Sequence, residues 1–171
     1  MERSRLPAPP ETDASDSVRS PDGRVLAIDL GTRRIGLAVS DPLGMTAQGL
    51  PTMERRNKKQ DLNFLRSLAR RYEISLLLVG NPLNMNGSEG PQSANARAFA
   101  KELGEHLGVA VQLWDERLTS VEAHRVLDET GVEKAGRRGT VDRLAAVLLL
   151  QNFLESRRGG SASGAGPDRE P

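Results

Sequence analysis

Short apolar runs in the first two thirds of the chain have the length of buried β-strands. Residues 25–30 are apolar apart from Asp29, and a glycine-containing turn at residues 31–34 leads into a second run at residues 35–40. Two short strands joined by a tight turn predict a β-hairpin. Three further runs predict strands at residues 48–53, 76–80 and 109–114.

Elsewhere the spacing of apolar residues is that of amphipathic helices. The predicted helices cover residues 58–72, 91–107, 119–131 and 140–155. The third opens on a Thr-Ser-Val-Glu capping box and ends at Gly131. Strands joined by short turns pair antiparallel, whereas strands joined through helices pair in parallel. The order of elements therefore predicts an α/β fold with a mixed five-stranded sheet, which fits the ribonuclease H-like fold.

Both ends of the chain lack the apolar side chains that a core requires. Residues 1–23 hold four prolines among charged and small residues, and residues 159–171 read GGSASGAGPDREP. Burial there is too small to offset the entropy lost on ordering, so we expect disordered tails around one domain at residues 24–158. There is no run of 18 apolar residues and no secretory signal, so we expect a cytoplasmic protein without membrane association.

Charge and composition limit the partners that the chain can have. It contains 24 Lys+Arg and 23 Asp+Glu, a net charge of +1, so a nucleic-acid partner would have to meet locally clustered basic residues. One such cluster consists of Arg55, Arg56, Lys58, Lys59, Arg66, Arg70 and Arg71. A solvated helix face is the alternative interpretation. Aromatic residues make up only 3% of the chain, so we do not expect a platform for stacking single-stranded bases.

Several acidic residues stand at positions where a carboxylate is unfavourable or constrained. Asp29 interrupts a buried strand, and a buried carboxylate without a partner is strongly destabilising. Asp142 begins a stripe of apolar residues at helical spacing, so its carboxylate faces inward. Asp115 and Glu116 end the fifth strand, and because adjacent strand residues point to opposite faces, only one of them can easily face a site.

Each of these acids also has a purely structural interpretation. Asp29 could cap a nearby turn, Asp142 could interact with the helix dipole, and an ion pair with Arg117 could occupy the strand end. Taken together, carboxylates from three separate elements indicate a site for Mg²⁺ or Mn²⁺, which prefer oxygen ligands. The absence of cysteine excludes thiolate ligands and a cysteine nucleophile. Two such ions can activate a water and stabilise the leaving oxygen of a phosphodiester.

The motifs around these acids resemble the YqgF family, the Holliday junction resolvase-like pre-16S rRNA nucleases. The matching segments are AIDLGTRRIGLAVSD (27–41), VGNPLNMNGSEG (79–90), DERLTSVEA (115–123) and VDRLAAVLLLQNFL (141–154). The resemblance implies a ribonuclease H-like fold with sheet order 3-2-1-4-5 and helices on both faces. It also implies a cytoplasmic enzyme that hydrolyses phosphodiester bonds with Mg²⁺ or Mn²⁺ and matures the 5′ end of small-subunit ribosomal RNA.

The resemblance also assigns residues to these roles. The family's acidic triad falls on Asp29, Glu116 and Asp142, which makes them the expected catalytic and metal-binding residues. The expected contacts with nucleic acid are Gly31, Thr32, Arg33, Arg34, Asn84, Arg117, Thr119 and Arg138. Turn chemistry is the alternative for Asn84, and solvated turn charges are the alternative for the two arginines after Asp29.

The sequence leaves the reach of Glu116 and the nature of the substrate open. In the expected sheet order the fifth strand lies two strands from the first, about 9.6 Å away at roughly 4.8 Å per step. Glu116 must therefore reach across the fourth strand to Asp29 or act through a water. Precursor ribosomal RNA is the leading substrate, branched DNA cleaved by a dimer is a second, and non-catalytic RNA or junction binding is a third interpretation. The chain is expected to act as a monomer or a homodimer.

Overall fold

The structure is a computed structural model that describes residues 23–117, 125, 129 and 137–161. One five-stranded sheet forms its centre, in the order β3-β2-β1-β4-β5. The strands are β1 (Arg24–Leu30), β2 (Arg34–Ser40), β3 (Ala47–Glu54), β4 (Ile74–Asn81) and β5 (Ala110–Asp115). The first three strands pair antiparallel, whereas β4 pairs in parallel with both β1 and β5. The predicted strand order and the mixed sheet are thus confirmed.

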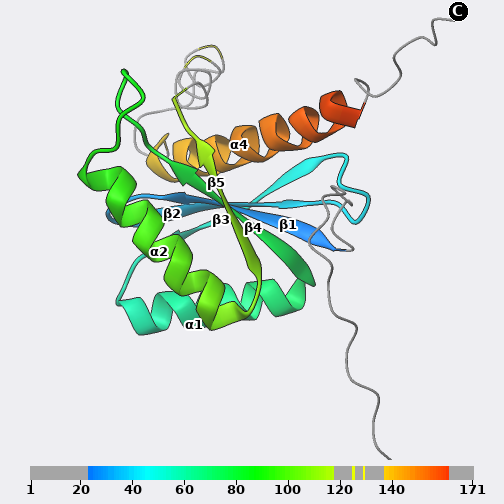
Figure 1. Ribbon diagram of the computed structural model, residues 1–171. Helices are drawn as coiled ribbons and strands as arrows, with labels where there is room; N and C mark the ends of the chain where they lie inside the picture. Colours follow the sequence, from blue (N-terminus) through cyan, green and yellow to red (C-terminus); the bar gives the residue numbers. More distant parts are fainter. Residues whose placement is uncertain (1–22, 118–124, 126–128, 130–136, 162–171) are drawn as a thin grey trace, which may run out of the picture.

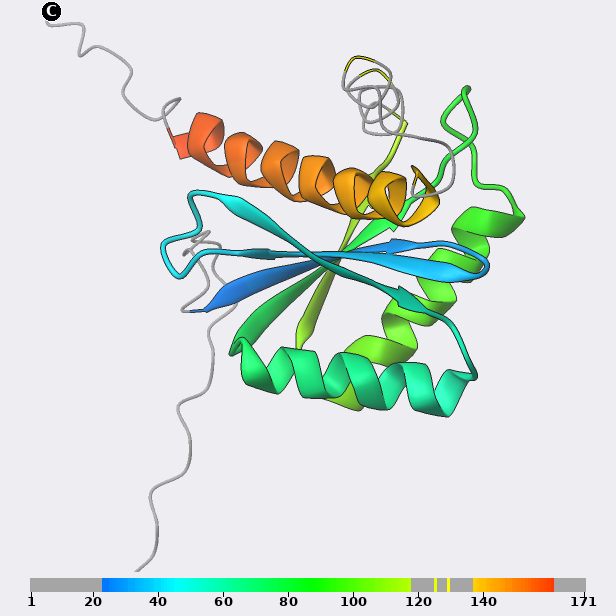
Figure 2. The same cartoon turned by 180° about the vertical axis from the view of Figure 1, so that it is seen from behind.

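Helices cover both faces of this sheet, as the resemblance implied. Helices α1 (Lys58–Arg71) and α2 (Pro91–Leu107) lie on one face, and α4 (Arg137–Ser161) crosses the other (Figures 1 and 2). Alternate residues of each strand enter the two halves of the core, as strand geometry requires. In β1, Leu26 and Ile28 pack with the α1–α2 side, while Val25 and Ala27 pack with the α4 side.

Helix α4 packs on the sheet through the apolar stripe that its sequence predicts. Ala146, Leu149 and Phe153 on this stripe are buried to 2% exposure or less. The helix is longer than predicted, because it runs from Arg137 to Ser161. Residues 159–161, which we expected to belong to the C-terminal tail, are therefore helical. Two glycines in the last turn are poor helix formers, and the packing of the preceding turns outweighs that preference.

Some of the predicted features lie outside the described residues. They include nearly all of the helix expected at residues 119–131, Thr119 itself, residues 1–22 and residues 162–171. Among the helices that the structure describes, none is long and apolar enough to cross a lipid bilayer.

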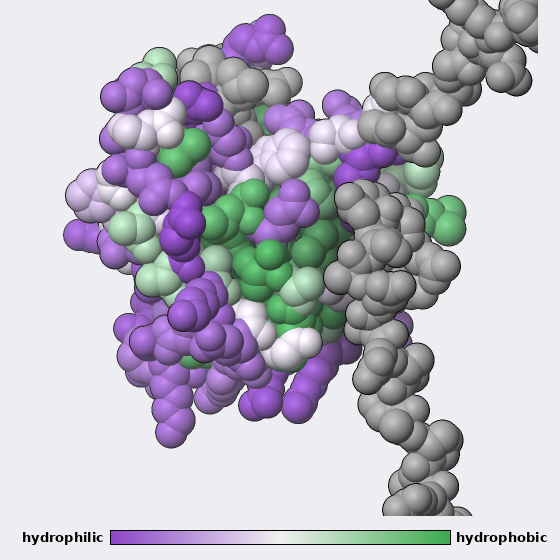
Figure 3. All heavy atoms as spheres, viewed as in Figure 1, coloured by the Kyte–Doolittle hydropathy of each residue, from purple (hydrophilic) through white to green (hydrophobic). Residues whose placement is uncertain are grey.

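Several connecting segments meet at one end of the molecule. The first turn of α4, the turn between β1 and β2, the segment between β3 and α1 and the loop between β4 and α2 all lie at the left of Figure 1. Hydrophilic side chains gather at this end, whereas hydrophobic surface is concentrated in the middle of the same view (Figure 3). The acids singled out in the sequence are also found at this end.

Candidate active site

Asp29 lies near the end of β1, on the face of the sheet that α4 covers. It follows Val25 and Ala27 in the alternation of the strand, and both of these pack against α4. Its cross-strand partner in β2 is Gly36. Burial raises the pKa of the Asp29 carboxyl, and the negative charge of Asp142 raises it further. Asp29 is therefore a half-buried acid that makes no ion pair with any of the described residues.

Glu116 reaches Asp29 by passing over a glycine of β4. It follows directly after β5, and its backbone N–H donates to the carbonyl of Asn81 at 3.2 Å. Val79 pairs with Ile28, which places the next residue, Gly80, beside Asp29. A Cβ atom on Gly80 would lie 1.9 Å from Oε1 of Glu116, so any larger side chain would occupy the space of this carboxyl group. The missing side chain of β4 thus explains how Glu116 spans two strand spacings.

The two acids share a hydrogen bond in the space above Gly80. Burial and the negative charge of Asp29 raise the pKa of the Glu116 carboxyl to about 9. Glu116 is therefore protonated at neutral pH and donates to the Asp29 carboxylate, which lowers the pKa of Asp29 against the effect of its burial. Two carboxyl groups in contact hold a proton in this way because they repel each other when both are ionised.

Asp142 is brought close to the pair by a second glycine. A Cβ atom on Gly36 would lie 2.1 Å from the carbonyl oxygen of Asp142, so the first turns of α4 sit directly on the backbone of β2. The hydroxyl of Thr52 in β3 also donates to the carbonyl of Gly139 at 2.7 Å and fixes the start of the helix. Since Gly36 is the cross-strand neighbour of Asp29, α4 delivers Asp142 beside that acid.

The side chain of Asp142 forms an ion pair with an arginine and does not take part in the hydrogen bond between the other two acids. Nε of Arg34 donates to Oδ2 of Asp142 at 2.9 Å, and both side chains are about 30% exposed. Arg34 begins β2, so this ion pair joins residues that are 108 positions apart in the sequence. It neutralises Asp142 and orients its carboxylate toward the β1–β2 turn.

Asp115 points away from the three acids. Its carboxylate accepts hydrogen bonds from the Arg117 guanidinium at 2.6 to 3.0 Å and from the Arg117 backbone N–H at 3.0 Å. This contact lowers the pKa of Asp115. The ion pair that we considered as an alternative for the strand end is thus made by Asp115, whereas Glu116 faces Asp29.

The loop after β4 contains Asn84 in a self-contained turn. Its side-chain amide donates to the Ser88 hydroxyl at 2.9 Å, and its backbone N–H donates to the Ser88 carbonyl at 2.9 Å. Gly87 at the tip has a positive φ of 83°, and its position lies close to the Arg117 guanidinium. The turn chemistry considered for Asn84 is thus present, and the tip of the loop lies beside Arg117, which follows β5.

Of the other residues predicted to contact nucleic acid, some lie next to Asp29 and others are described only in part or not at all. Gly31, Thr32 and Arg33 form the turn next to Asp29, where the Gly31 N–H donates to the Arg34 carbonyl at 2.9 Å. Thr119 lies outside the described residues, and of Arg138 the structure describes only the helical backbone.

The predicted basic cluster has a first part at the start of α1 and a last part at its end, with Lys59 and Arg66 between them on the helix. Arg55, Arg56 and Lys58 lie at the start of α1, beside the β1–β2 turn, and line a groove of about 660 Å³ together with Arg33 and Arg34. Arg70 and Arg71 occupy the last turn of the same 14-residue helix. At about 1.5 Å per residue they lie about 20 Å from Lys58. Only the first part is near the acids.

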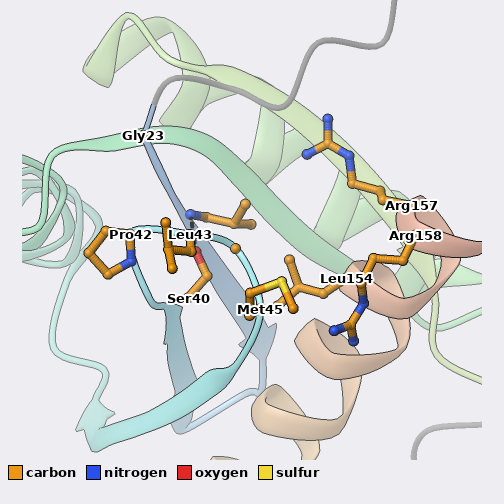
Figure 4. Close-up of a pocket in the computed structure, with 10 residues that line it drawn as sticks. Gly23, Ser40, Pro42, Leu43, Met45, Leu154, Arg157 and Arg158 are labelled. Carbon is orange, nitrogen blue, oxygen red and sulfur yellow. Dashed lines mark hydrogen bonds between the residues drawn. The ribbon is translucent and has the colours of Figure 1, made fainter. Parts of the chain in front are cut away.

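Another hollow lies at the opposite end of the sheet (Figure 4). This cavity of about 290 Å³ adjoins the start of β1, between the loop after β2 and the end of α4, where Arg157 and Arg158 are found. None of the described residues that line it is acidic. It is therefore separate from the candidate active site.

The three acids offer the kind of ligand that the divalent cation implied by the sequence requires. Their carboxylate oxygens are suitable donors for Mg²⁺ or Mn²⁺, and a hydrogen-bonded acid pair of raised pKa would gain from a nearby positive charge. Within residues 23–117, 125, 129 and 137–161, however, no three acidic or histidine side chains converge closely enough to hold an ion. Asp29 and Glu116 would bind a cation only after Glu116 loses its proton, and Asp142 would join them by leaving Arg34.

Two residues that build the site were missed by sequence reasoning. Gly36 and Gly80 flank Asp29 on its two neighbouring strands and admit Asp142 and Glu116 respectively. Each interrupts an apolar strand, and an isolated glycine inside a strand often marks the close approach of another group. The signal was present, but its meaning depends on the register of the sheet.

Known proteins that resemble this chain identify its family and its fold. The family model described as "RuvX: Holliday junction resolvase" matches residues 23–156. A protein of Koribacter versatilis (strain Ellin345) named "Putative pre-16S rRNA nuclease" is 54% identical over 135 residues, which cover 79% of this chain and 88% of that protein. A protein of the same name from Myxococcus xanthus (strain DK1622) is 48% identical over 135 residues, covering 79% and 89%.

A solved structure shares the fold at low sequence identity. It is the T. thermophilus RuvC in complex with a Holliday junction substrate, with a TM-score of 0.50 and 17% identity over 80% of this chain and 96% of that chain. This similarity supports the ribonuclease H-like fold predicted from the sequence. Because the family model covers most of the chain and the two relatives are about half identical to it, the chain belongs to the RuvX family, which is the YqgF family that its motifs resemble.

Proposed function

We propose that this chain is a nuclease that hydrolyses phosphodiester bonds in precursor 16S ribosomal RNA, and that Asp29, Glu116 and Asp142 form its active site. Its membership of the RuvX family and the names of its relatives support the activity and the substrate. The observation that carries the proposal is the meeting of Asp29 and Glu116 above Gly80, with Asp142 alongside. We place the protein in the cytoplasm as a monomer or homodimer.

The three acids would hold Mg²⁺ or Mn²⁺ through their carboxylate oxygens. A cation in this position supplies positive charge that activates a water and stabilises the leaving oxygen of the phosphodiester. Glu116 must release its proton before it can become a ligand, because only the ionised carboxylate binds a metal well. Asp142 must turn away from Arg34, which leaves this guanidinium available for another anion.

Arg34 is placed to exchange its present partner for the phosphate of the substrate. Its guanidinium lies between Asp142 and the groove at the start of α1. A guanidinium group binds the oxygens of a phosphate as readily as it binds those of a carboxylate, and in the same bidentate geometry. In this role Arg34 would orient the phosphodiester and neutralise part of the negative charge that grows in the transition state.

A second candidate function is the cleavage of branched DNA. The description of the family model favours it, since it names the family a Holliday junction resolvase. Both functions use the same acids and differ in the nucleic acid that the surface around them accepts. The choice between RNA and branched DNA therefore depends on that surrounding surface.

Cleavage of the two substrates by the purified full-length protein tests the proposal. A precursor 16S RNA fragment that carries the immature 5′ end and a four-way DNA junction are each incubated with Mg²⁺, with Mn²⁺ or with EDTA. We expect cleavage of the RNA with either metal and none in EDTA. Cleavage of the junction alone would favour the second function, and cleavage that persists in EDTA would contradict the metal-binding role of the acids.

A further inference from the structure

A groove rich in arginine begins beside the acids and continues around the end of the sheet. It lies between the β1–β2 turn and the start of α1, and five of its lining side chains are cationic. They are Arg33, Arg34, Arg55, Arg56 and Lys58. Two acids, Glu54 and Asp61, also line it. The arginine groove is therefore positive on balance, although the whole chain is nearly neutral.

Arg55 connects the two sides of the groove, which are the β1–β2 turn and the start of α1. Its backbone N–H donates to the Arg33 carbonyl at 2.9 Å, and its guanidinium donates to the Gly31 carbonyl at 3.0 Å. The same guanidinium lies 3.5 Å from the buried carboxylate of Asp61 and stacks on Phe99. The groove is thus already formed in the isolated chain.

Two other arginines have no such structural role. Arg33 and Arg56 are exposed, and neither side chain makes an ion pair within the described part of the chain. In contrast, Lys58 is paired with Glu102 at 2.7 Å and Arg34 with Asp142. Guanidinium groups without a partner on a preformed surface are suited to binding phosphate.

A recess that contains the exposed ring of Phe64 adjoins the arginine groove. The two hollows share Glu54, Arg56 and Asp61, and the recess of about 420 Å³ is completed by Met53, Gln60 and Phe64. All five aromatic residues of the chain lie in the described part, and Phe64 alone is exposed, with 45% of its surface accessible. A single exposed ring beside a phosphate-binding groove is suited to stacking against one unpaired base.

We propose that the arginine groove binds the sugar-phosphate backbone of a single-stranded segment of the substrate, with Arg33 and Arg56 on its phosphates and one unstacked base in the recess against Phe64. The inference rests on the proposed function and specifies its substrate as unpaired next to the cleavage site. A base inside a duplex is stacked on its neighbours and does not present its face to a protein ring. The recess therefore favours a single-stranded RNA end over the paired arms of a junction.

The test separates phosphate contacts from base contacts by using two oligonucleotides of equal length. One is an ordinary single-stranded oligoribonucleotide, and the other has the same backbone with abasic residues throughout. Fluorescence anisotropy gives the affinity of the full-length protein for each in EDTA, so that binding is measured without turnover. The variants are Arg33→Ala, Arg56→Ala, Phe64→Ala and Phe64→Leu, with Arg70→Ala as a matched control at the far end of α1.

We expect the arginine and phenylalanine variants to differ in a defined way. Arg33→Ala and Arg56→Ala should each weaken the binding of both oligonucleotides. Each should also reduce the slope of log affinity against log salt concentration by about 0.7, the value for one phosphate of a single strand. Phe64→Ala should lower the affinity for the ordinary oligonucleotide about tenfold and leave the affinity for the abasic one unchanged. Phe64→Leu keeps an apolar side chain but no ring, so its affinity for the ordinary oligonucleotide should fall nearly as much. Arg70→Ala should bind both oligonucleotides as tightly as the unmodified protein.

Other outcomes would overturn the inference. If Arg70→Ala weakens binding as much as Arg56→Ala, attraction is spread over the surface and the groove has no special role. If Phe64→Ala affects both oligonucleotides equally or neither, no base occupies the recess. Failure of the groove and failure of the proposed function are distinguishable, because metal-dependent cleavage that is insensitive to these variants rejects only the groove. Binding that follows the predicted pattern without any cleavage rejects only the nuclease function.

Discussion

Gly80 of β4 and Glu116 after β5 are complementary, because the carboxyl group of the glutamate fills the space of the side chain that the glycine lacks. A Cβ atom at Gly80 would lie 1.9 Å from Oε1 and 2.7 Å from Cδ of Glu116. The glycine is thus a condition for the contact between Glu116 and Asp29.

Gly80→Ala should therefore inactivate the enzyme without removing any acid. The methyl group would displace the Glu116 carboxyl from Asp29, and a misplacement of about 1 Å in a catalytic group lowers the rate by roughly a hundredfold. Initial rates of cleavage measure the effect, and circular dichroism checks the fold. Gly139→Ala is the control, since a Cβ at Gly139 meets nothing within 4 Å. Equal rates for Gly80→Ala and the unmodified protein would show that Glu116 does not act from this position.

Arg34→Gln should strengthen the binding of Mn²⁺ in the absence of substrate. The ion pair with Asp142 is partly exposed, and such pairs contribute about 0.2–1 kcal/mol. Breaking it frees Asp142 to join the other two acids, which corresponds to a gain in affinity of up to about fivefold. Titration calorimetry with Mn²⁺ measures the change. A loss of Mn²⁺ affinity would mean that Arg34 holds Asp142 in the position that a metal requires.

The metal-free protein should become less stable as the pH rises. Glu116 has a pKa of about 9 in the folded chain and an ordinary value of 4.5, so between these values the folded state holds a proton that the unfolded state has released. Stability then falls with increasing pH, by on the order of 1 kcal/mol per unit at most. Melting temperatures in EDTA across this window measure the slope. Glu116→Gln should flatten it, and an unchanged slope would indicate that Glu116 is ionised in the folded chain.

Removal of residues 1–22 and 162–171 should leave folding and cleavage nearly unchanged. Within the described part of the chain, the two core clusters lie between residues 25 and 154, and the terminal sequences contain few apolar side chains. Differential scanning calorimetry and initial rates compare the shortened chain with the full one. A fall in melting temperature of more than a few degrees would show that one of the removed segments packs on the domain.

The fold could be predicted from the sequence because its signals are local. The buried runs of β1 and β4 and the helical stripe of α4 each appear within a short segment, and the connections between them determine which strands are antiparallel. The opposite orientation of Asp115 and Glu116 follows from strand geometry in the same way. Among the elements that the structure describes, only the ends were misplaced, as at Ser161, where packing outweighs the low helix propensity of glycine.

The geometry of the site could not be predicted, because it depends on contacts between distant segments. The ion pair of Arg34 and Asp142 joins two elements that are 108 residues apart. The role of Gly80 depends on the register of β4 against β1. Neither this register nor the ion pair can be recognised from the order of residues in the sequence. The basic cluster appeared continuous in the sequence, although the length of α1 separates its two ends by about 20 Å.

Cleavage of the precursor 16S RNA fragment by four single-residue variants tests the central claim most directly. Asp29→Asn, Glu116→Gln and Asp142→Asn keep the size of each side chain and remove its ability to ionise, whereas Asp115→Asn removes a neighbouring charge that faces Arg117. With Mg²⁺ or Mn²⁺ present, we predict that the first three lower the rate about a thousandfold or more and that Asp115→Asn retains most of it. Full cleavage by a folded Asp29→Asn variant, or loss of cleavage in Asp115→Asn but not in Glu116→Gln, would contradict the account.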